Sequence, residues 1–349
     1  MMYARSALWT TLLTLSFVSC AHANTEDEYQ DFTNRIGDEV RARDFEALDH
    51  EANGYRHDKS RMSDGRWKLA MFYRAVNSAL PDIVGSPRRK EEFETDLTQF
   101  AKAHPESMNV PLLLAQTAEA VGWKARGNGT ADTVTPKGWH EFGQAMDGAA
   151  AILDHQRARL VGNPEWYALR MEVAIYRNES QPAIRALFDE GVRREPAYLA
   201  LYQTMQLNLS PMWNGSNRAL MDFVNDAGHR SPAAASEGLY ARLVWNASPD
   251  YVRIELDPRL DWAAMRDGMD AVVARYPAER NVQKFFLMAC SHPDKKEAQK
   301  LLAKIHEAPS REILDNNVPI FKLCQDWAAG KIPQFIMRDP DTGEQRLIK

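Results

Sequence analysis

The sequence predicts an all-α protein, built as an irregular α-solenoid of antiparallel helix pairs that is tetratricopeptide-like. Apolar residues recur with the helical period along most of the chain, helix ends repeat one signature, and strand-like alternation is scarce. The 349 residues, 44% hydrophobic and 26% charged, are typical of a folded protein. This composition excludes collagen-like, disordered and multi-span membrane classes.

The helical period is clearest in two segments. Apolar residues of 265–276 and of 183–192 each fall on one face of an α-helix. The same spacing predicts helices over residues 28–40, 66–80, 92–103, 110–123, 141–153 and 280–290. Further helices are expected to start at Pro164 and to cover 294–305 and 318–329.

Three of these segments end in the same way, with a cation followed by a proline at Pro105, Pro196 or Pro277. A cation in the last turn opposes the helix dipole, and proline cannot continue the helix. This pattern resembles the proline between tetratricopeptide repeats. The prolines are unevenly spaced, however, and the Trp, Leu, Gly and Tyr positions of that repeat are missing, so we expect degenerate helix pairs.

The expected organisation has four parts: a signal peptide at 1–23, an N-terminal helical region at 24–130, a C-terminal helical-repeat region at 131–330 and an extended tail at 331–349. The softest boundary is the polar stretch 127–136. Two extended segments are candidates for strands. They are Val252, Ile254 and Leu256, and a terminal hairpin over 335–348 around a turn at 341–343.

The first residues have the features of an export signal. Arg5 precedes an apolar run over 7–18, and Ala21-His22-Ala23 offers small residues to a signal peptidase. We therefore expect an exported, periplasmic protein with no transmembrane segment, since no other stretch is long enough to span a bilayer. Cys20 leaves an alternative open, because a lipid attached there would anchor the chain to a membrane.

The charge pattern bears on the partner. The formal net charge is −5, and the densest basic cluster, at 88–90, is followed directly by two glutamates. Nucleic-acid binding needs clustered Lys and Arg, so nucleic acid is not expected as a partner. The expected partner is a protein or peptide of the cell envelope.

The absence of familiar catalytic motifs favours a non-enzymatic role, and we expect an exported helical-repeat protein that acts as a binding or assembly scaffold. The sequence contains no phosphate-binding P-loop, no serine nucleophile elbow, no His-Glu-x-x-His and no dinucleotide-binding glycine motif. No cofactor and no metal site are expected. The alternative function is a cell-envelope glycan hydrolase with Glu106 or Glu141 as the acid, because Glu106-Ser107 matches the catalytic pair of lytic transglycosylases. The motifs that follow that pair in transglycosylases are missing, so Glu106-Ser107 is also interpreted as helix-capping chemistry.

Aromatic and arginine side chains near helix ends are the candidates for binding. Tryptophan, tyrosine and arginine dominate the hot spots of protein interfaces. We expect a concave binding face lined by some of Trp67, Trp123, Arg126, Trp166, Trp213, Tyr240 and Arg242. The alternative is structural, with tryptophans packed between helix pairs and arginines stacked on them.

The same segments carry a family resemblance over most of the chain. They are residues 65–69 (GRWKL), 123–134 (WKARGNGTADTV), 164–167 (PEWY), 195–198 (EPAY), 211–216 (PMWNGS), 261–262 (DW) and 275–277 (RYP). The chain resembles the bacterial domain of unknown function 4034 family. Asn214 departs from the glycine expected there, although asparagine tolerates the same turn. The resemblance implies an exported helical protein and brings no assigned activity.

Two cysteines, Cys290 and Cys324, remain after removal of the signal peptide. Export places them in an oxidising compartment, and an even number leaves none unpaired. One helix is expected between the helices that carry them, which would let the two side chains meet. We predict a disulfide, with two separately buried thiols as the alternative.

Overall fold

The computed structural model describes residues 25–213, 215–228, 237–248, 254–309, 318–338 and 345–349. The predicted signal peptide, Cys20, Asn214 and the turn at 341–343 lie outside these residues. The described part is all-helical apart from one two-stranded sheet, which confirms the predicted all-α class. Within it, no helix is both long and apolar enough to cross a membrane.

The elements follow one another with short connections. The first half contains α1 (Thr25–Ala42), α2 (Phe45–Asp58), α3 (Lys68–Val84), α4 (Pro87–Ala103), α5 (Val110–Arg126), the 3-10 helix η1 (Ala131–Thr133), α6 (Pro136–His155) and α7 (Arg157–Leu160). The second half contains α8 (Pro164–Tyr176), α9 (Gln181–Arg194), α10 (Leu199–Leu209), α11 (Asn217–Gly228), α13 (Leu239–Ala247), η2 (Ile254–Leu256), α14 (Trp262–Arg275), α15 (Glu279–Ser291), α16 (Lys295–Leu302), α17 (Val318–Ala328), β1 (Phe335–Arg338) and β2 (Gln345–Ile348).

Local chemistry sets the helix boundaries. Side chains of Ser86, Thr135 and Asp261 accept a hydrogen bond from the first turn of α4, α6 and α14, which satisfies free amides there. Helices α4, α9 and α14 end near the predicted sites, two residues before Pro105, Pro196 and Pro277 respectively. All of the helices that the apolar spacing predicts are present.

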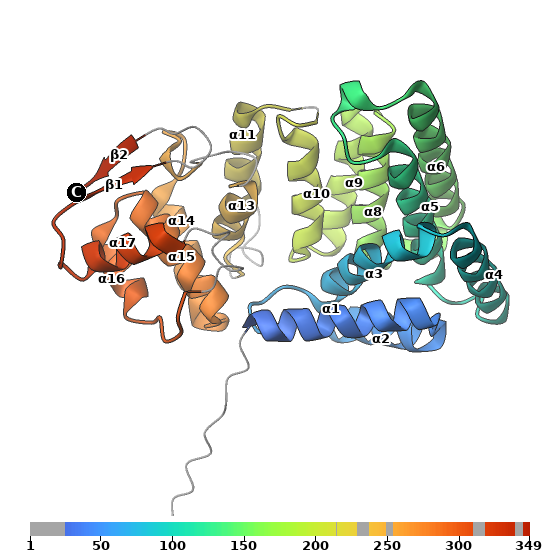
Figure 1. Cartoon of the computed structure of the whole chain (residues 1–349), viewed down its shortest axis with the longest axis horizontal. Helices are drawn as coiled ribbons and strands as arrows, with labels where there is room; N and C mark the ends of the chain where they lie inside the picture. The colour runs from blue at the N-terminus through green and yellow to red at the C-terminus, as the bar shows by residue number, and fades with distance from the viewer. Residues whose placement is uncertain (1–24, 214, 229–236, 249–253, 310–317, 339–344) are drawn as a thin grey trace, which may run out of the picture.

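Neighbouring helices pack against each other along the molecule. Contacts pair α5 with α6, α8 with α9, α11 with α13 and α15 with α16. A second series of contacts joins α3 to α5, α5 to α8, α8 to α10 and α10 to α13, so these helices form one layer. Figure 1 shows the chain passing from α4, α5 and α6 at one end to α16, α17 and the hairpin at the other.

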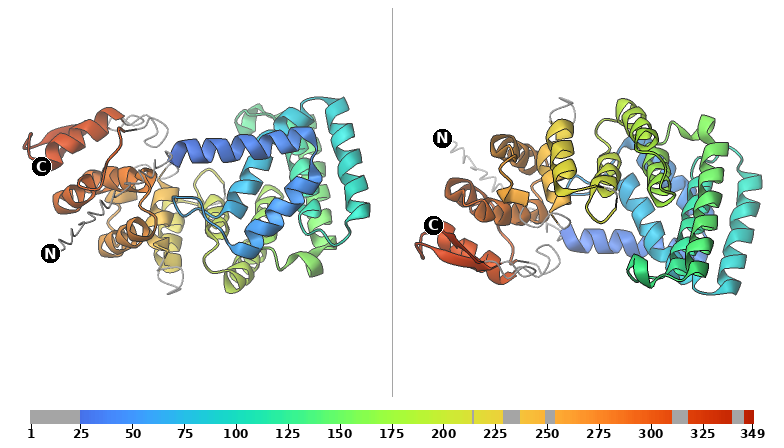
Figure 2. Two further views of the ribbon diagram at one scale, coloured as in Figure 1. Left: turned by 90° about the horizontal axis from the view of Figure 1, so that it is seen from below. Right: turned by 90° about the horizontal axis from the view of Figure 1, so that it is seen from above.

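Helices α1 and α2 lie across this row rather than within it. Figure 2 shows α1 running along the side of the molecule, with α3 at one end and the C-terminal helices beyond the other. Helix α1 packs on α3 and also contacts α15. The N-terminal helices therefore bridge parts of the chain that are far apart in sequence.

The expected boundary at 127–136 does not separate the helices on either side of it. These residues form a loop with η1, and the two helices that it joins, α5 and α6, pack closely together. Most buried apolar residues of the described chain also belong to one cluster that extends from Phe32 to Ile348. The polar composition of 127–136 therefore reflects a loop between two packed helices and not a boundary between separate cores.

The loop 59–67 connects distant elements. Trp67 Nε1 donates a 2.8 Å hydrogen bond to the carbonyl oxygen of Ala197, before α10. Asn281 Nδ2, on α15, donates one of 3.1 Å to the carbonyl oxygen of Asp64. The loop turns at Gly65, whose φ of +87° is in the region that favours glycine.

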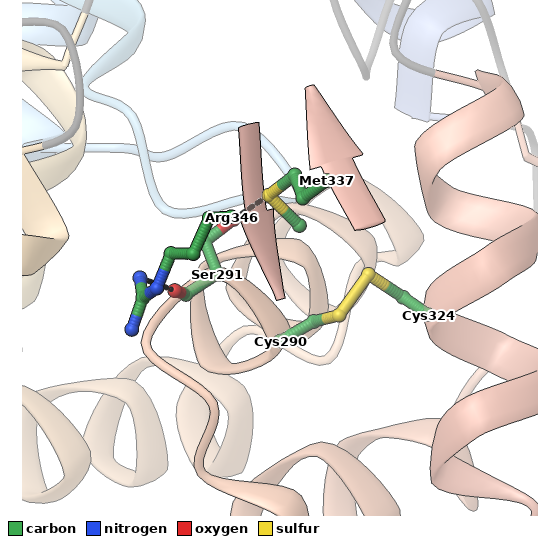
Figure 3. Close-up of a disulfide and its surroundings, with 5 residues drawn as sticks. All are labelled: Cys290, Ser291, Cys324, Met337 and Arg346. Carbon is green, nitrogen blue, oxygen red and sulfur yellow. Dashed lines mark hydrogen bonds between the residues drawn. A yellow bond between two sulfur atoms is a disulfide. The ribbon is translucent and has the colours of Figure 1, made fainter. Parts of the chain in front are cut away.

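The C-terminal part is tied together by the predicted disulfide. The sulfurs of Cys290, at the end of α15, and Cys324, on α17, are bonded, which confirms the pairing (Figure 3). Beside this bond, Arg346 Nη1 of β2 donates a 2.8 Å hydrogen bond to the carbonyl oxygen of Ser291. The disulfide and the hairpin therefore meet at the end of α15.

One of the two strand predictions is correct. Strands β1 and β2 pair antiparallel with Phe335 opposite Ile348, as expected for the terminal hairpin. The prediction of a strand from Val252 to Leu256 is wrong for the residues described, because Ile254–Leu256 is the 3-10 helix η2. The apolar side chain of Ile254 is fully buried and packs in the helical core, and this segment does not pair with another strand in the described residues.

Candidate functional site

Helices α3, α5, α8 and α10 surround a cavity of about 280 Å³, which we call the carboxylate cavity. Its polar lining comes from every one of these helices: Tyr73, Arg74, Asn77, Gln116, Glu165, Glu172, Gln203 and Thr204. Alanine, methionine and leucine side chains complete the wall. A concave site with converging polar groups is the usual form of a ligand site.

Two carboxylates face this cavity from α8. Glu165 and Glu172 are two helical turns apart, so they project from the same side of the helix. The hydroxyl of Tyr198 donates a 2.6 Å hydrogen bond to Glu165 Oε2, and that of Tyr176 donates one of 2.7 Å to Glu172 Oε1. These tyrosines hold the carboxyl groups in place.

Burial changes the protonation of these groups. Removal from water raises the pKa of Glu165 to about 8. The hydrogen bond from Tyr198 and the charge of Arg74 lower this pKa, and the charge of Glu172 raises it. Burial also raises the pKa of Glu172. The pKa of Glu119, buried on α5, is well above the usual range because of burial and then the charge of Glu172. Glu165 therefore holds a proton at neutral pH that an exposed carboxylate would have lost.

Gln116 gives the cavity an unsatisfied acceptor. Its side chain is 5% exposed and its Nε2 donates a 3.1 Å hydrogen bond to the carbonyl oxygen of Tyr73. Its Oε1 is buried and has no hydrogen-bond partner among the described residues. A buried acceptor without a donor costs about 1–3 kcal/mol, so a ligand that supplies an N–H or O–H would gain that amount.

Beside the cavity is an aromatic cluster of Trp123, Phe142, Tyr176 and Trp213. Trp123 meets the other three with ring centroids 5.3, 5.2 and 6.4 Å away, each edge to face. Tyr176 belongs to both features, since its hydroxyl bonds to Glu172. Arg126 closes one side, with its guanidinium carbon 5.1 Å from the ring centres of Trp123 and Trp139.

Three of the seven predicted binding residues, Trp123, Arg126 and Trp213, therefore lie together. All three are half-buried, and Trp139, which the prediction omitted, is 41% exposed beside them. They form one candidate surface next to the carboxylate cavity.

The other four predicted binding residues are buried and line no open face. Trp166 is fully buried and donates a 3.0 Å hydrogen bond to the carbonyl oxygen of Leu153. Trp67 packs edge to face on Tyr198, and Arg242 bonds to the loop 59–67. Tyr240 donates a 2.7 Å hydrogen bond to Asn225. These four residues therefore have the structural role that was given as the alternative. The three aromatic rings fill space between helices, and Arg242 bonds to a neighbouring loop.

Neither acid of the alternative function lies in an apolar pocket. The Glu106 side chain is 75% exposed near His104, and that of Glu141 is 45% exposed near Lys137. Ser107 accepts 3.2 Å hydrogen bonds from the amides of Asn109 and Val110, which confirms its capping role at the start of α5.

Four further residues of this site were not predicted from the sequence: Gln116, Glu119, Glu165 and Glu172. One signal could have found them: each is a polar residue within a helix whose other residues are mostly apolar or aromatic on every side. A helix that is apolar all round is buried, so its acids must be buried with it. Among the described side chains, no group of three or more His, Cys, Asp or Glu residues could hold a metal ion.

Comparisons with family models, curated proteins and solved structures found no match for this chain. The resemblance to the domain of unknown function 4034 family stays a prediction.

Proposed function

We propose that this chain is an exported, periplasmic binding protein of the domain of unknown function 4034 family. In this proposal its helix pairs form an irregular, tetratricopeptide-like α-solenoid, and its partner is a protein or peptide of the cell envelope. The binding site is the carboxylate cavity together with the aromatic cluster. The observation that carries the proposal is the buried, unpartnered Oε1 of Gln116 at a cavity lined by polar groups from four helices.

The aromatic cluster supports the same proposal. Trp213 lies between Tyr176, at 5.1 Å, and Trp123. Half-buried aromatic side chains offer a large contact area with little loss of side-chain entropy. Such a surface, linked to a polar cavity through the hydrogen bond of Tyr176 to Glu172, suits a peptide segment that inserts one side chain.

The test is recovery of a partner from periplasmic extract by immobilised protein. We expect one partner to bind wild type and Met212→Ala equally and to be lost with Trp213→Ala. Met212 is the matched control, because it is adjacent to Trp213 and points to solvent. Equal recovery by all three proteins, or none by wild type, would contradict the proposal. Amino-terminal sequencing of the secreted protein tests export separately.

A second candidate function is hydrolysis of envelope glycans, and Glu165 favours it. A carboxylic acid whose pKa is about 8 is mostly protonated at pH 7 and can donate a proton to a glycosidic oxygen. This moves the acid from Glu106 or Glu141 to the cavity. A zymogram on purified peptidoglycan should then clear with wild type, Glu106→Gln and Glu141→Gln, and fail with Glu165→Gln. No clearing by wild type would reject hydrolysis.

A further inference from the structure

We propose that the carboxylate cavity binds an alkylammonium group, from a lysine side chain of a peptide or from a free aliphatic amine. This inference rests on the proposed binding function and names the chemistry of the ligand. It stands on three features of the cavity: its hydrogen-bond acceptors, its charge and its size.

The acceptors come from two helices. Glu165 and Glu172 line the cavity from α8, and Gln116 lines it from α5 with an Oε1 that no donor among the described residues satisfies. Tyr198 and Tyr176 supply one hydrogen bond to each glutamate, and a carboxylate accepts several. An ammonium group has three donors and no acceptor, so it matches this set.

The charge excludes an anionic ligand once the acids ionise. Glu165 and Glu172 line the cavity, and Glu119 lies close enough that their charges act on it. The cation that lines the same space is Arg74, which is exposed on α3. Three acids are therefore balanced by one arginine, whose charge is screened by solvent. A buried carboxylate gains most from a partner of opposite charge.

The size and the wall suit a short aliphatic chain. The volume of about 280 Å³ is at the lower limit of small-molecule pockets. Its apolar wall includes Ala70, Ala168 and Leu207, against which methylene groups can pack while the charged end reaches the glutamates. An aromatic side chain or a nucleotide would not gain from this combination.

Binding should be coupled to proton release. Several groups face the two glutamates: Arg74 and Tyr73 from α3, Glu119 from α5, Tyr176 from α8 itself and Tyr198 before α10. Burial favours the protonated form of these acids, and a bound cation favours loss of the proton. An alkylammonium keeps its charge to about pH 10, so affinity should rise from pH 6 to pH 8 by about tenfold or more.

Isothermal titration of the full-length mature protein tests the inference. The probes are 1,5-diaminopentane as a free amine, N-acetyl-lysine methylamide as a peptide side chain, and the uncharged N-acetyl-norleucine methylamide and 1-pentanol as matched controls. We expect at least one amine to bind and both uncharged probes to fail. Binding of the free amine alone assigns the ligand to small amines, and binding of the lysine derivative assigns it to a peptide.

Two variants separate the cavity from the rest of the surface. Glu165→Gln/Glu172→Gln should weaken amine binding by about 100-fold, and the exposed Glu141→Gln should not change it. If the double variant does not fold, Glu165→Gln alone takes its place, and loss of the gain in affinity between pH 6 and pH 8 in that variant assigns the amine to the cavity. Failure of both amines, equal binding of the uncharged probes or an unchanged affinity in a folded double variant would overturn the inference. A partner that depends on Trp213 would leave the proposed binding function standing in that case.

Discussion

Arg242 Nη2 donates a 2.9 Å hydrogen bond to the carbonyl oxygen of Asp64, a residue 178 positions earlier in the chain. Arg242 is 8% exposed on α13, and its Nε also donates to the carbonyl oxygen of Glu237, at 3.1 Å. Because the same Asp64 oxygen accepts from Asn281, the loop 59–67 is held by α13 and α15 together. This junction joins the N-terminal helices to the C-terminal ones.

Replacement of this arginine should loosen the junction. Arg242→Met keeps most of the volume and leaves the Asp64 and Glu237 carbonyl oxygens without these donors. We expect the free energy of unfolding to fall by about 2–4 kcal/mol, measured by urea denaturation. Arg218→Met is the matched control, because Arg218 is 86% exposed, and it should change stability by less than about 0.5 kcal/mol. Equal effects of the two substitutions would show that the junction contributes nothing.

Gly65 tests the same junction through the backbone. A Cβ at Gly65 would lie 2.5 Å from Arg242 Nη2 and 2.5 Å from the ring of Tyr276, in a conformation with φ of +87°. Gly65→Ala should therefore cost about 2 kcal/mol or more. Gly143→Ala on α6 should instead stabilise by about 0.5–1 kcal/mol, because nothing lies within 4 Å of its Cβ. A neutral Gly65→Ala in thermal unfolding would contradict the close approach.

The disulfide should stabilise the last elements most. It closes a loop of 34 residues, and loss of the bond in Cys290→Ala/Cys324→Ala should lower the free energy of unfolding by about 3–4 kcal/mol. Hydrogen exchange should speed up first in α17 and the hairpin, since the bond ties them to α15. Reductant should have this effect on wild type and none on the double variant. Two free thiols in wild-type protein that is alkylated without reduction would contradict the prediction.

Glu165 should make stability depend on pH. Its pKa is about 8 in the folded protein and near 4.5 in the unfolded chain, so the folded state holds the proton more tightly. The stability from this group is complete below about pH 4.5 and is lost as pH rises toward 8. Relative to Glu165→Gln, wild type should lose on the order of 3 kcal/mol between pH 5 and pH 8. Parallel pH profiles of urea denaturation for the two proteins would reject the raised pKa.

The helices were predictable because their signals are local. The apolar spacing of 265–276 and the proline at Pro277 predict α14, which spans Trp262–Arg275. Hydrogen bonds four residues apart and caps within one turn depend on neighbouring residues only. The cysteine pair was predictable for a related reason, since only one helix was expected between its two partners.

The wrong or incomplete predictions concern residues whose surroundings come from elsewhere in the chain. Tryptophan and arginine composition could not distinguish Trp213, half-buried beside Trp123, from Trp166, fully buried under α6. The same residue type serves as surface or as core according to which helices cover it. Glu106 was a candidate acid because of the serine beside it, although the Glu106 side chain is 75% exposed.

By itself, the sequence determined the helical class of this protein, most of its helix boundaries and its pair of bonded cysteines. Only the tertiary structure decided that Gln116, Glu165 and Glu172 share one cavity and that the loop 59–67 joins the two ends of the chain. The helices depend on interactions within a few residues, which repeat wherever the local pattern repeats, whereas the cysteine pair follows from the expected export and an even number of cysteines. The shared cavity depends on how the helices of one layer, α3, α5, α8 and α10, pack together, and that packing removes water from acids that an isolated helix would leave charged.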